Sequence, residues 1–261
     1  MRLTVLGCCG TYAAPGGACS GYLVSTEGTT LWIDAGSGTL ANLQRHVAPG
    51  DIDAVVLSHE HPDHWTDVEG FFYATRFAGR RSGPAPSGDA DSRQRPRGVP
   101  VYAPAGLRRR TYEDHAPHLA WNDVAEGDEV VVGRLRLRFS RTDHGPETLA
   151  VRVDGPGASL GYSADTGPGW SLEALGPGLD LALCEATFQR PQEGSARHLS
   201  ARQAGASARD AGARRLVLTH VWPTMDRERT RAEGSEAYGG VADLAETNET
   251  YDVTLRPSEP K

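Results

Sequence analysis

The residues that could do chemistry are concentrated in one short segment, residues 58–64, which read S-H-E-H-P-D-H. The segment directly follows the apolar run Ala54–Leu57 and precedes a stretch with helical spacing. Four potential metal ligands on a strand-to-helix turn can converge on one point. Their imidazole nitrogens and carboxylate oxygens suit zinc, iron or manganese, and the segment offers no thiolate. The pattern therefore predicts a metal site on His59, His61, Asp63 and His64.

Three more residues of metal-binding types follow apolar runs further along the chain. They are His144 after the run 135–139, Asp165 after 160–162, and His220 after 216–218. Taken singly, each could be structural, but with the first segment they make seven candidate ligands, five His and two Asp. Seven ligands and a bridging oxygen suffice for two metal ions. Two ions about 3.5–4 Å apart can stabilise both the attacking and the leaving oxygen of a displacement reaction.

The elements that position these residues are short strands with a few helices between them. Runs rich in Val and Leu predict strands at 3–6, 21–24, 31–33, 54–57, 99–102, 135–139, 149–153, 160–162, 179–183, 216–218 and 253–255. Helical spacing predicts helices at 40–47, 63–77, 201–211 and 236–246, the third with Ser200 as its N-cap and Gly212 after its end. Because strands outnumber helices and include antiparallel-looking runs, we expect two packed sheets with helices outside.

Length and composition indicate a globular protein. The 261 residues are 38% hydrophobic and 23% charged, which excludes a disordered, collagen-like or coiled-coil chain. No apolar run approaches the roughly 20 residues of a membrane helix, and residues 1–7 do not resemble a signal peptide. We therefore expect a cytoplasmic protein that does not bind a membrane. The four cysteines fit no metal or disulfide spacing, so we expect buried, reduced thiols.

Charge is distributed unevenly along the chain. The formal net charge of -7 disfavours generic nucleic-acid binding, which needs positive surface. Nine arginines nevertheless lie between Arg76 and Arg110, against Asp89 and Asp91. This run could be a solvated face or could face a phosphate. Residues 79–98 are mainly Gly, Pro, Ser, Asp and Arg without periodicity, so we expect a flexible insertion there, within one domain spanning 1–261.

The order and spacing of the candidate ligands resemble those of the metallo-β-lactamase superfamily. The H-x-H-x-D-H pattern at residues 59–64 is highly specific, and the three later ligands follow in the family's order. The resemblance extends from residue 3 to about residue 255 and implies a four-layer αββα sandwich with metal ions at one sheet edge. It implies that one ion binds His59, His61 and His144, that the other binds Asp63, His64 and His220, and that Asp165 bridges them.

Within that superfamily the chain is similar to the tRNase Z and phosphodiesterase branch. Residues 183–188, L-C-E-A-T-F, resemble its E-A-T-F segment, and residues 198–204, H-L-S-A-R-Q-A, resemble its H-x-[ST]-A-x-x-A segment. The resemblance implies that His198 donates a proton to the leaving oxygen and that Glu185 orients His198. Histidine suits this task because its pKa lies near neutral pH. Alternatively, His198 caps the alanine-rich helix that follows it.

Two features depart from the tRNase Z pattern. After the last histidine that family usually reads F-S-x-R-Y, whereas residues 221–226 here are V-W-P-T-M-D, and the family's long tRNA-gripping arm is not evident. The chain looks more like the arm-less bacterial relatives described as phosphodiesterases. Trp222 could stack on a base or pack in the core, and residues 7–11, G-C-C-G-T, could bind phosphate or form a tight turn.

We therefore expect a dinuclear metal-dependent hydrolase with two divalent ions, zinc first and manganese or iron as alternatives. The expected reaction is hydrolysis of a nucleotide or cyclic nucleotide by a metal-bound hydroxide, with Asp63 also relaying a proton. A lactonase or thioesterase on the same fold and a tRNA 3′-processing endoribonuclease are the alternatives, so RNA is a less favoured partner. Relatives in this branch are often dimers, so a homodimer is compatible with the sequence.

Overall fold

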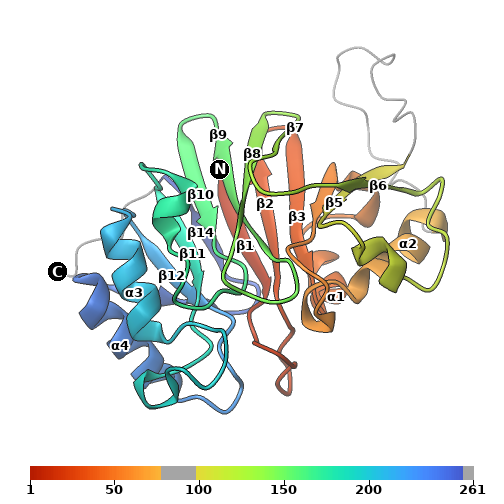
Figure 1. The fold of residues 1–261 in the computed structure, drawn as a ribbon. Helices are drawn as coiled ribbons and strands as arrows, with labels where there is room; N and C mark the ends of the chain where they lie inside the picture. The colour runs from red at the N-terminus through yellow and green to blue at the C-terminus, as the bar shows by residue number, and fades with distance from the viewer. Residues whose placement is uncertain (78–97, 255–261) are drawn as a thin grey trace.

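The structure, a computed structural model, describes residues 1–77 and 98–254 (Figure 1). The insertion expected at 79–98 lies outside the described residues except for Gly98. The arginines between 80 and 97 and the last residue of the strand expected at 253–255 also lie outside them. None of the described helices is both long enough and apolar enough to cross a membrane.

Two seven-stranded sheets form the centre of the molecule. In spatial order the first sheet contains β14 (Thr250–Asp252), β1 (Arg2–Gly7), β2 (Gly21–Thr26), β3 (Thr29–Ala35), β4 (Ala54–Val56), β5 (Val99–Ala103) and β6 (Leu119–Asp123). The second contains β13 (Ala242–Leu244), β12 (Leu216–Thr219), β11 (Leu181–Glu185), β10 (Ala158–Tyr162), β9 (Leu149–Gly155), β8 (Leu135–Arg141) and β7 (Glu129–Val132). Strands β3 to β6 of the first sheet are parallel, as are β10 to β13 of the second. Residues that follow parallel strands gather at one sheet edge, where ligands commonly bind in such sheets.

Helices cover the outer face of each sheet. They are α1 (Thr39–Leu43), α2 (Asp67–Phe77), α3 (Ala201–Asp210) and α4 (Arg227–Tyr238). Figure 1 shows α1 and α2 beside the first sheet and α3 and α4 on the opposite side of the molecule, beside the second. One apolar core lies between the sheets, a second includes Trp32 and Phe71 under α2, and a third includes Ala204 and Leu218 under α3. These layers confirm the predicted αββα sandwich.

The prediction of a helix at 236–246 is wrong, because α4 spans Arg227–Tyr238 and Ala242–Leu244 is a strand. Helix α4 starts earlier because the Asp226 side chain accepts a hydrogen bond from the backbone N–H of Arg229 and caps its first turn. The helix ends at Gly239, whose φ of 78° is left-handed. Ala242–Leu244 then pairs in parallel with β12 as strand β13. This pairing is a tertiary contact that the local sequence pattern does not reveal.

The other helices differ less from expectation. The helix expected at 63–77 is divided, because a 3-10 turn, η2 (Pro62–His64), precedes α2. Strands β6 and β7 were not predicted. Helix α3 does begin after Ser200, whose side chain and that of Gln203 form a reciprocal capping box. Gly212 follows this helix with a φ of 63°.

Candidate metal centre

All seven candidate ligands follow strand ends, and the fold brings them into one cluster. Residues 58–64 follow β4, His144 follows β8, Asp165 follows β10 and His220 follows β12. Both sheets therefore contribute. The cluster contains two groups of donor atoms that share the carboxylate of Asp165.

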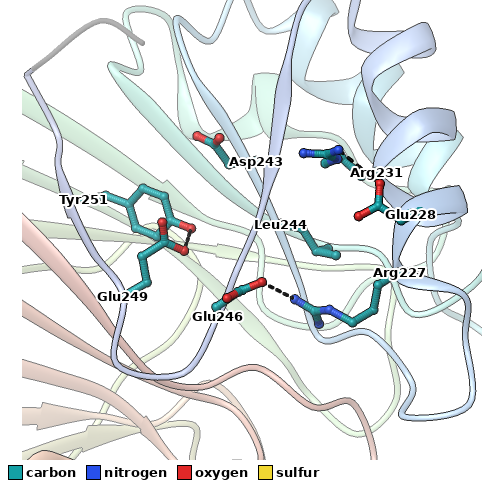
Figure 2. A pocket seen from close by; sticks show the side chains of 8 residues that line it. All are labelled: Arg227, Glu228, Arg231, Asp243, Leu244, Glu246, Glu249 and Tyr251. Carbon is teal, nitrogen blue, oxygen red and sulfur yellow. Dashed lines mark hydrogen bonds and ion pairs between the residues drawn. The ribbon is translucent and has the colours of Figure 1, made fainter. Parts of the chain in front are cut away.

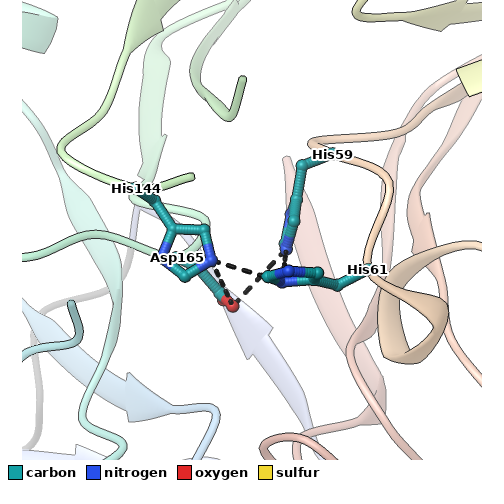
Figure 3. Close-up of side chains that lie close together, drawn as sticks. All are labelled: His59, His61, His144 and Asp165. Atoms are coloured by element: carbon teal, nitrogen blue, oxygen red, sulfur yellow. Dashed lines mark hydrogen bonds and ion pairs between the residues drawn. The ribbon is translucent and has the colours of Figure 1, made fainter. Parts of the chain in front are cut away.

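The first group consists of three histidines and one carboxylate oxygen (Figure 3). Nδ1 of His61 lies 3.1 Å from Nε2 of His59 and 3.3 Å from Nε2 of His144. Oδ2 of Asp165 lies 3.6 Å from Nε2 of His59 and 3.9 Å from Nε2 of His144. A tetrahedral zinc ion with bonds of about 2.0–2.1 Å sets its ligand atoms about 3.3–3.4 Å apart. The separations in this group are close to that spacing.

The second group fits a tetrahedron more closely. Nε2 of His64 lies 3.3 Å from Nε2 of His220, and these nitrogens lie 3.5 and 3.3 Å from Oδ2 of Asp63. Oδ1 of Asp165 lies 3.3 and 3.4 Å from the same two nitrogens. This oxygen is buried, and no donor among residues 1–77 and 98–254 makes a hydrogen bond to it. A buried carboxylate oxygen without a donor fits a metal ligand, so the residues present suit divalent cations.

Hydrogen bonds outside the cluster fix how three of the rings present their nitrogens. Nδ1 of His64 donates to Asp34 at 2.7 Å, Nδ1 of His144 donates to the carbonyl of Arg197 at 2.9 Å, and Nδ1 of His220 bonds Oγ1 of Thr187 at 2.8 Å. A carboxylate or carbonyl only accepts, so the partner Nδ1 carries the proton. In its neutral form, such a ring keeps the lone pair of Nε2 toward the cluster, as a metal-binding histidine requires.

The charges within the cluster favour a cation there. Burial and the neighbouring His64 hold the pKa of His59 well below its ordinary value, so this ring is neutral. Burial opposes ionisation of Asp165, but the charges of His220 and His64 outweigh it and hold the carboxyl pKa well below its usual range. Burial also opposes the charge on His64, yet Asp165 and Asp34 raise its pKa well above the ordinary value. The anionic groups thus attract positive charge strongly enough to overcome desolvation.

Four buried carboxylates surround this region: Asp34, Asp63, Asp165 and Glu185. Within the described part of the chain, no arginine side chain pairs with any of them. Isolated buried carboxylates are costly unless positive charge or several donors compensate them. Asp34 and Glu185 each accept several hydrogen bonds, and bound divalent cations would compensate Asp63 and Asp165.

Asp34 is a buried residue that contacts the candidate site and that the sequence reasoning missed. It is the next-to-last residue of the buried strand β3, and its carboxylate accepts hydrogen bonds from the N–H and Oγ–H of Ser58, at 2.7 and 2.8 Å, and from the hydroxyl of Tyr162 at 2.7 Å. These donors leave the carboxylate in place to orient His64. In the sequence Asp34 directly follows the apolar run 31–33, as the predicted ligands follow theirs, and this was the available signal.

Backbone conformations around the cluster are unusual. Thr11, Asp34, Ala164 and His220 have left-handed φ values of 65°, 53°, 50° and 53°. Such values are uncommon for residues other than glycine, and they concentrate at functional sites. Residues 7–11 form a turn in which the Thr11 N–H donates to Oδ2 of Asp63 at 2.8 Å. The loop therefore positions a candidate ligand.

His198 lies beside the cluster and is held by Glu185. Nδ1 of His198 is 3.0 Å from Oε1 of Glu185 and 4.0 Å from Oδ2 of Asp165. Burial lowers the pKa of His198, but the charge of Glu185 and its hydrogen bond raise it to about 9. Helix α3 is capped by Ser200, so the alternative role of His198 as a helix cap is excluded.

Glu185 is itself fixed by several donors. It is fully buried at the end of β11 and accepts hydrogen bonds from the backbone N–H of Thr166 and from Oγ1 of Thr187, both at 2.6 Å. The hydroxyl of Thr187 also contacts Nδ1 of His220, so one threonine connects Glu185 to the ligand cluster. The sequence reasoning included Thr187 only as part of a motif and assigned it no role.

Two of the four described arginines of the basic run, Arg108 and Arg110, pair with acids. Arg110 makes a bidentate ion pair with Glu60, at 2.9 and 2.8 Å, within the 58–64 segment. Arg108 pairs with Asp114 at 3.2 Å. Arg110 therefore attaches the 3-10 turn Leu107–Arg110 to the loop that contains four candidate ligands.

A separate pocket lies between α4 and strands β13 and β14 (Figure 2). Its charged side chains contact one another: Arg227 pairs with Glu246 at 3.6 Å, Arg231 with Glu228 at 3.0 Å, and Tyr251 donates to Glu249 at 2.6 Å. None of its lining residues belongs to the ligand cluster. The pocket's charges are thus already paired within the protein.

Residues 29–221 match the family model described as a beta-lactamase superfamily domain. The uncharacterized protein Rv1339 of Mycobacterium tuberculosis is 36% identical over 266 residues, covering 97% of this chain and 92% of that protein. The probable metallo-hydrolase YhfI of Bacillus subtilis is 29% identical over 253 residues, covering 95% and 98%. The YhfI crystal structure aligns with a TM-score of 0.82 and 27% identity over 96% and 98% of the two chains. A ribonuclease Z of Myxococcus xanthus is 28% identical over 309 residues, covering 98% and 99%.

Proposed function

The chain belongs to the metallo-β-lactamase superfamily, and its relatives include the probable metallo-hydrolase YhfI and a ribonuclease Z. We propose that it is a dinuclear phosphodiesterase acting on a nucleotide or cyclic nucleotide. The observation that carries the proposal is the contact between His198 and Glu185 beside the ligand cluster. A protonated histidine beside a site that would hold two cations suits a reaction in which an alkoxide leaves from phosphorus. The ribonuclease Z relative, whose name indicates cleavage of RNA phosphodiesters, supports the same chemistry.

The two donor groups would each hold one ion. His59, His61 and His144 would bind the first, and Asp63, His64 and His220 the second, with Asp165 shared. Zinc suits this set of imidazole and carboxylate ligands, and manganese or iron is compatible with it. Bound ions would supply Lewis-acid chemistry, lowering the pKa of a water molecule and offsetting charge on the phosphate oxygens.

The protein's own residues manage the protons. Glu185 holds Nδ1 of His198, so Nε2 is the atom that can donate to the departing oxygen. Asp63 accepts a hydrogen bond from the Thr11 N–H and lies 3.3 Å from Nε2 of His220, close enough to the ligand cluster to take a proton from the nucleophile. His198 thus acts as the general acid, Glu185 as its positioning residue and Asp63 as ligand and proton relay.

Hydrolysis of bis(p-nitrophenyl) phosphate tests the proposal. Chelator-treated protein should be inactive, and added Zn²⁺ or Mn²⁺ should restore turnover. Metal analysis of the reloaded protein should give two ions per chain. His61→Ala and Asp165→Asn should each lower kcat by at least about 100-fold, because each removes a ligand that the other residues cannot replace. Undiminished turnover in either variant would contradict the assignment.

A substrate panel separates the alternatives on this fold. Faster hydrolysis of a lactone or thioester than of any phosphodiester would favour the lactonase or thioesterase alternative. A single cut at the 3′ side of a tRNA precursor would favour the endoribonuclease, which the full-length similarity to ribonuclease Z keeps in consideration. We expect cyclic nucleotides or dinucleotides to give the highest kcat/KM.

A further inference from the structure

The indole of Trp222 lies beside the candidate metal centre and takes no part in the proposed chemistry. Its Nε1 donates to Oγ1 of Thr11 at 2.7 Å, and the N–H of Thr11 donates to Oδ2 of Asp63 at 2.8 Å. Two hydrogen bonds therefore connect the ring to a candidate ligand. Trp222 also follows His220 by only two positions, so its backbone is fixed to the same cluster.

Ring contacts hold the indole from a second side. The buried ring of Phe188 packs edge-on against Trp222, with centroids 5.1 Å apart at an angle of 80°. The same Phe188 ring packs edge-on against His198, at 5.8 Å and 89°. Two successive ring contacts thus separate Trp222 from the proposed general acid.

Core packing does not account for this arrangement. Trp222 is half-buried, and among the described residues it belongs to none of the three apolar cores and does not pack against them. Trp170, also half-buried, does pack against the third core. The indole N–H of Trp222 is already satisfied by Thr11, so what the ring can still offer is its apolar surface.

We propose that Trp222 is the platform on which the base of the substrate nucleotide stacks, an inference that rests on the proposed phosphodiesterase function. A base joined through its sugar to a phosphate at the ligand cluster would lie against a ring fixed beside that cluster. Stacking on an aromatic side chain tolerates every base and strengthens binding by about 5- to 150-fold. The site should therefore prefer nucleosidic phosphodiesters to base-free ones and discriminate little among bases.

Two substrates with one leaving group test the platform. Thymidine 5′-(p-nitrophenyl phosphate) and methyl p-nitrophenyl phosphate both release p-nitrophenolate, so their difference isolates the nucleoside. In metal-loaded protein, Trp222→Ala should lower kcat/KM for the thymidine ester by about 5- to 150-fold and change that for the methyl ester by less than about threefold. Trp222→Phe keeps a stacking ring and should retain most of the thymidine preference, even if the Ala variant folds poorly.

Trp121→Phe is the matched control. Trp121 is also half-buried and donates its Nε1–H to a side chain, Nδ1 of His115, on the edge strand β6. Its replacement should alter neither ester's kcat/KM. Equal losses on both esters in Trp222→Ala, or no loss on the thymidine ester, would overturn the platform.

Failure of the proposed function gives a different result. If metal-loaded wild-type protein hydrolyses neither ester, the phosphodiesterase proposal fails. The platform is then decided by calorimetric titration with thymidine 5′-monophosphate. Weaker binding by Trp222→Ala than by wild-type protein supports it, and equal affinity or no binding to either protein overturns it.

Discussion

The carboxylate of Asp34 lies 2.7 Å from Nδ1 of His64, and both side chains are fully buried. The contact joins the end of β3 to the 58–64 segment after β4, two neighbouring parallel strands. It determines which nitrogen of His64 carries the proton, because the carboxylate can only accept. Asp34 therefore controls a candidate ligand without belonging to either donor group.

Asp34→Asn should weaken metal binding. The amide keeps the size of the side chain but can present an N–H to Nδ1 of His64, which would move the ring proton to Nε2, the atom that faces the cluster. Loss of such an outer contact typically lowers metal affinity by about 10- to 100-fold. Competition with a chromophoric zinc chelator measures the change. The control is Asp226→Asn, which replaces the N-cap of α4 with another good cap and should leave zinc affinity unchanged. Wild-type zinc affinity in Asp34→Asn would contradict the role of Asp34 in orienting His64.

His198→Ala should affect substrates according to their leaving groups. Turnover of an alkyl phosphodiester, whose alkoxide needs a proton to leave, should fall by about 10²–10⁴-fold. Turnover of a p-nitrophenyl ester should fall much less, since p-nitrophenolate leaves without protonation. A plot of log kcat against leaving-group pKa therefore becomes steeper in the variant.

Two variants make this measurement specific. Glu185→Gln removes the charge that raises the pKa of His198, so it should steepen the same plot to a smaller extent. His46→Ala removes an exposed histidine that contacts Asn248, and it should leave the plot unchanged. Equal slopes of log kcat against leaving-group pKa in wild type and His198→Ala would show that His198 is not the general acid.

There is a physical reason why the sequence predicts that the seven candidate ligands lie together. Each of its candidate residues follows an apolar strand, and the ends of packed strands converge wherever the strands come from along the chain. Asp34 also comes directly after an apolar run in the sequence, but its partners Ser58 and Tyr162 come together only through the folded sheets. A single acidic residue after a strand does not reveal such partners.

Errors in the element assignment have a similar origin. Strand β13 has three residues and depends on its parallel pairing with β12, so the local pattern of 236–246 gave no indication of it. The helix expected at 63–77 is divided because Trp65, with φ of -143° and ψ of -13°, leaves the helical conformation after η2. Pro62 and the candidate ligands Asp63 and His64 form that 3-10 turn.

Thiol labelling should distinguish one cysteine from the others. Burial is the main cause that raises the pKa of Cys8 to about 11 and that of Cys184 to about 12, and Cys19 is buried as well. The thiolate is the reactive form, so at pH 8 Cys8 would be only about 0.1% reactive. Cys9 is half-buried and should be the first residue that iodoacetamide modifies in the folded protein, as mass spectrometry can show.

The same pKa values predict how stability depends on pH. A thiol whose pKa is raised in the folded state ionises first in the unfolded chain. The free energy of unfolding should therefore be unaffected by Cys8 below pH 9.0 and should fall as the pH rises toward about 11.

In the labelling experiment, denatured protein should label at all four cysteines, and rapid labelling of Cys8 or Cys184 in folded protein would contradict their burial.

Gly10→Ala should disturb the cluster through the backbone. A Cβ atom at this position would lie 2.5 Å from the carbonyl oxygen of His220 and 3.0 Å from its Nδ1. The N–H of Gly10 also donates to the carbonyl of Val221 at 3.0 Å, so the two loops cannot separate without losing a hydrogen bond. Overpacking of this kind costs about 1–3 kcal/mol. Gly10→Ala should lower both the Tm and the zinc affinity of the protein. The control is Gly240→Ala, which should change neither, because its Cβ would lie 3.4 Å from the ring of Tyr238. Wild-type zinc affinity in Gly10→Ala would show that His220 does not depend on this contact.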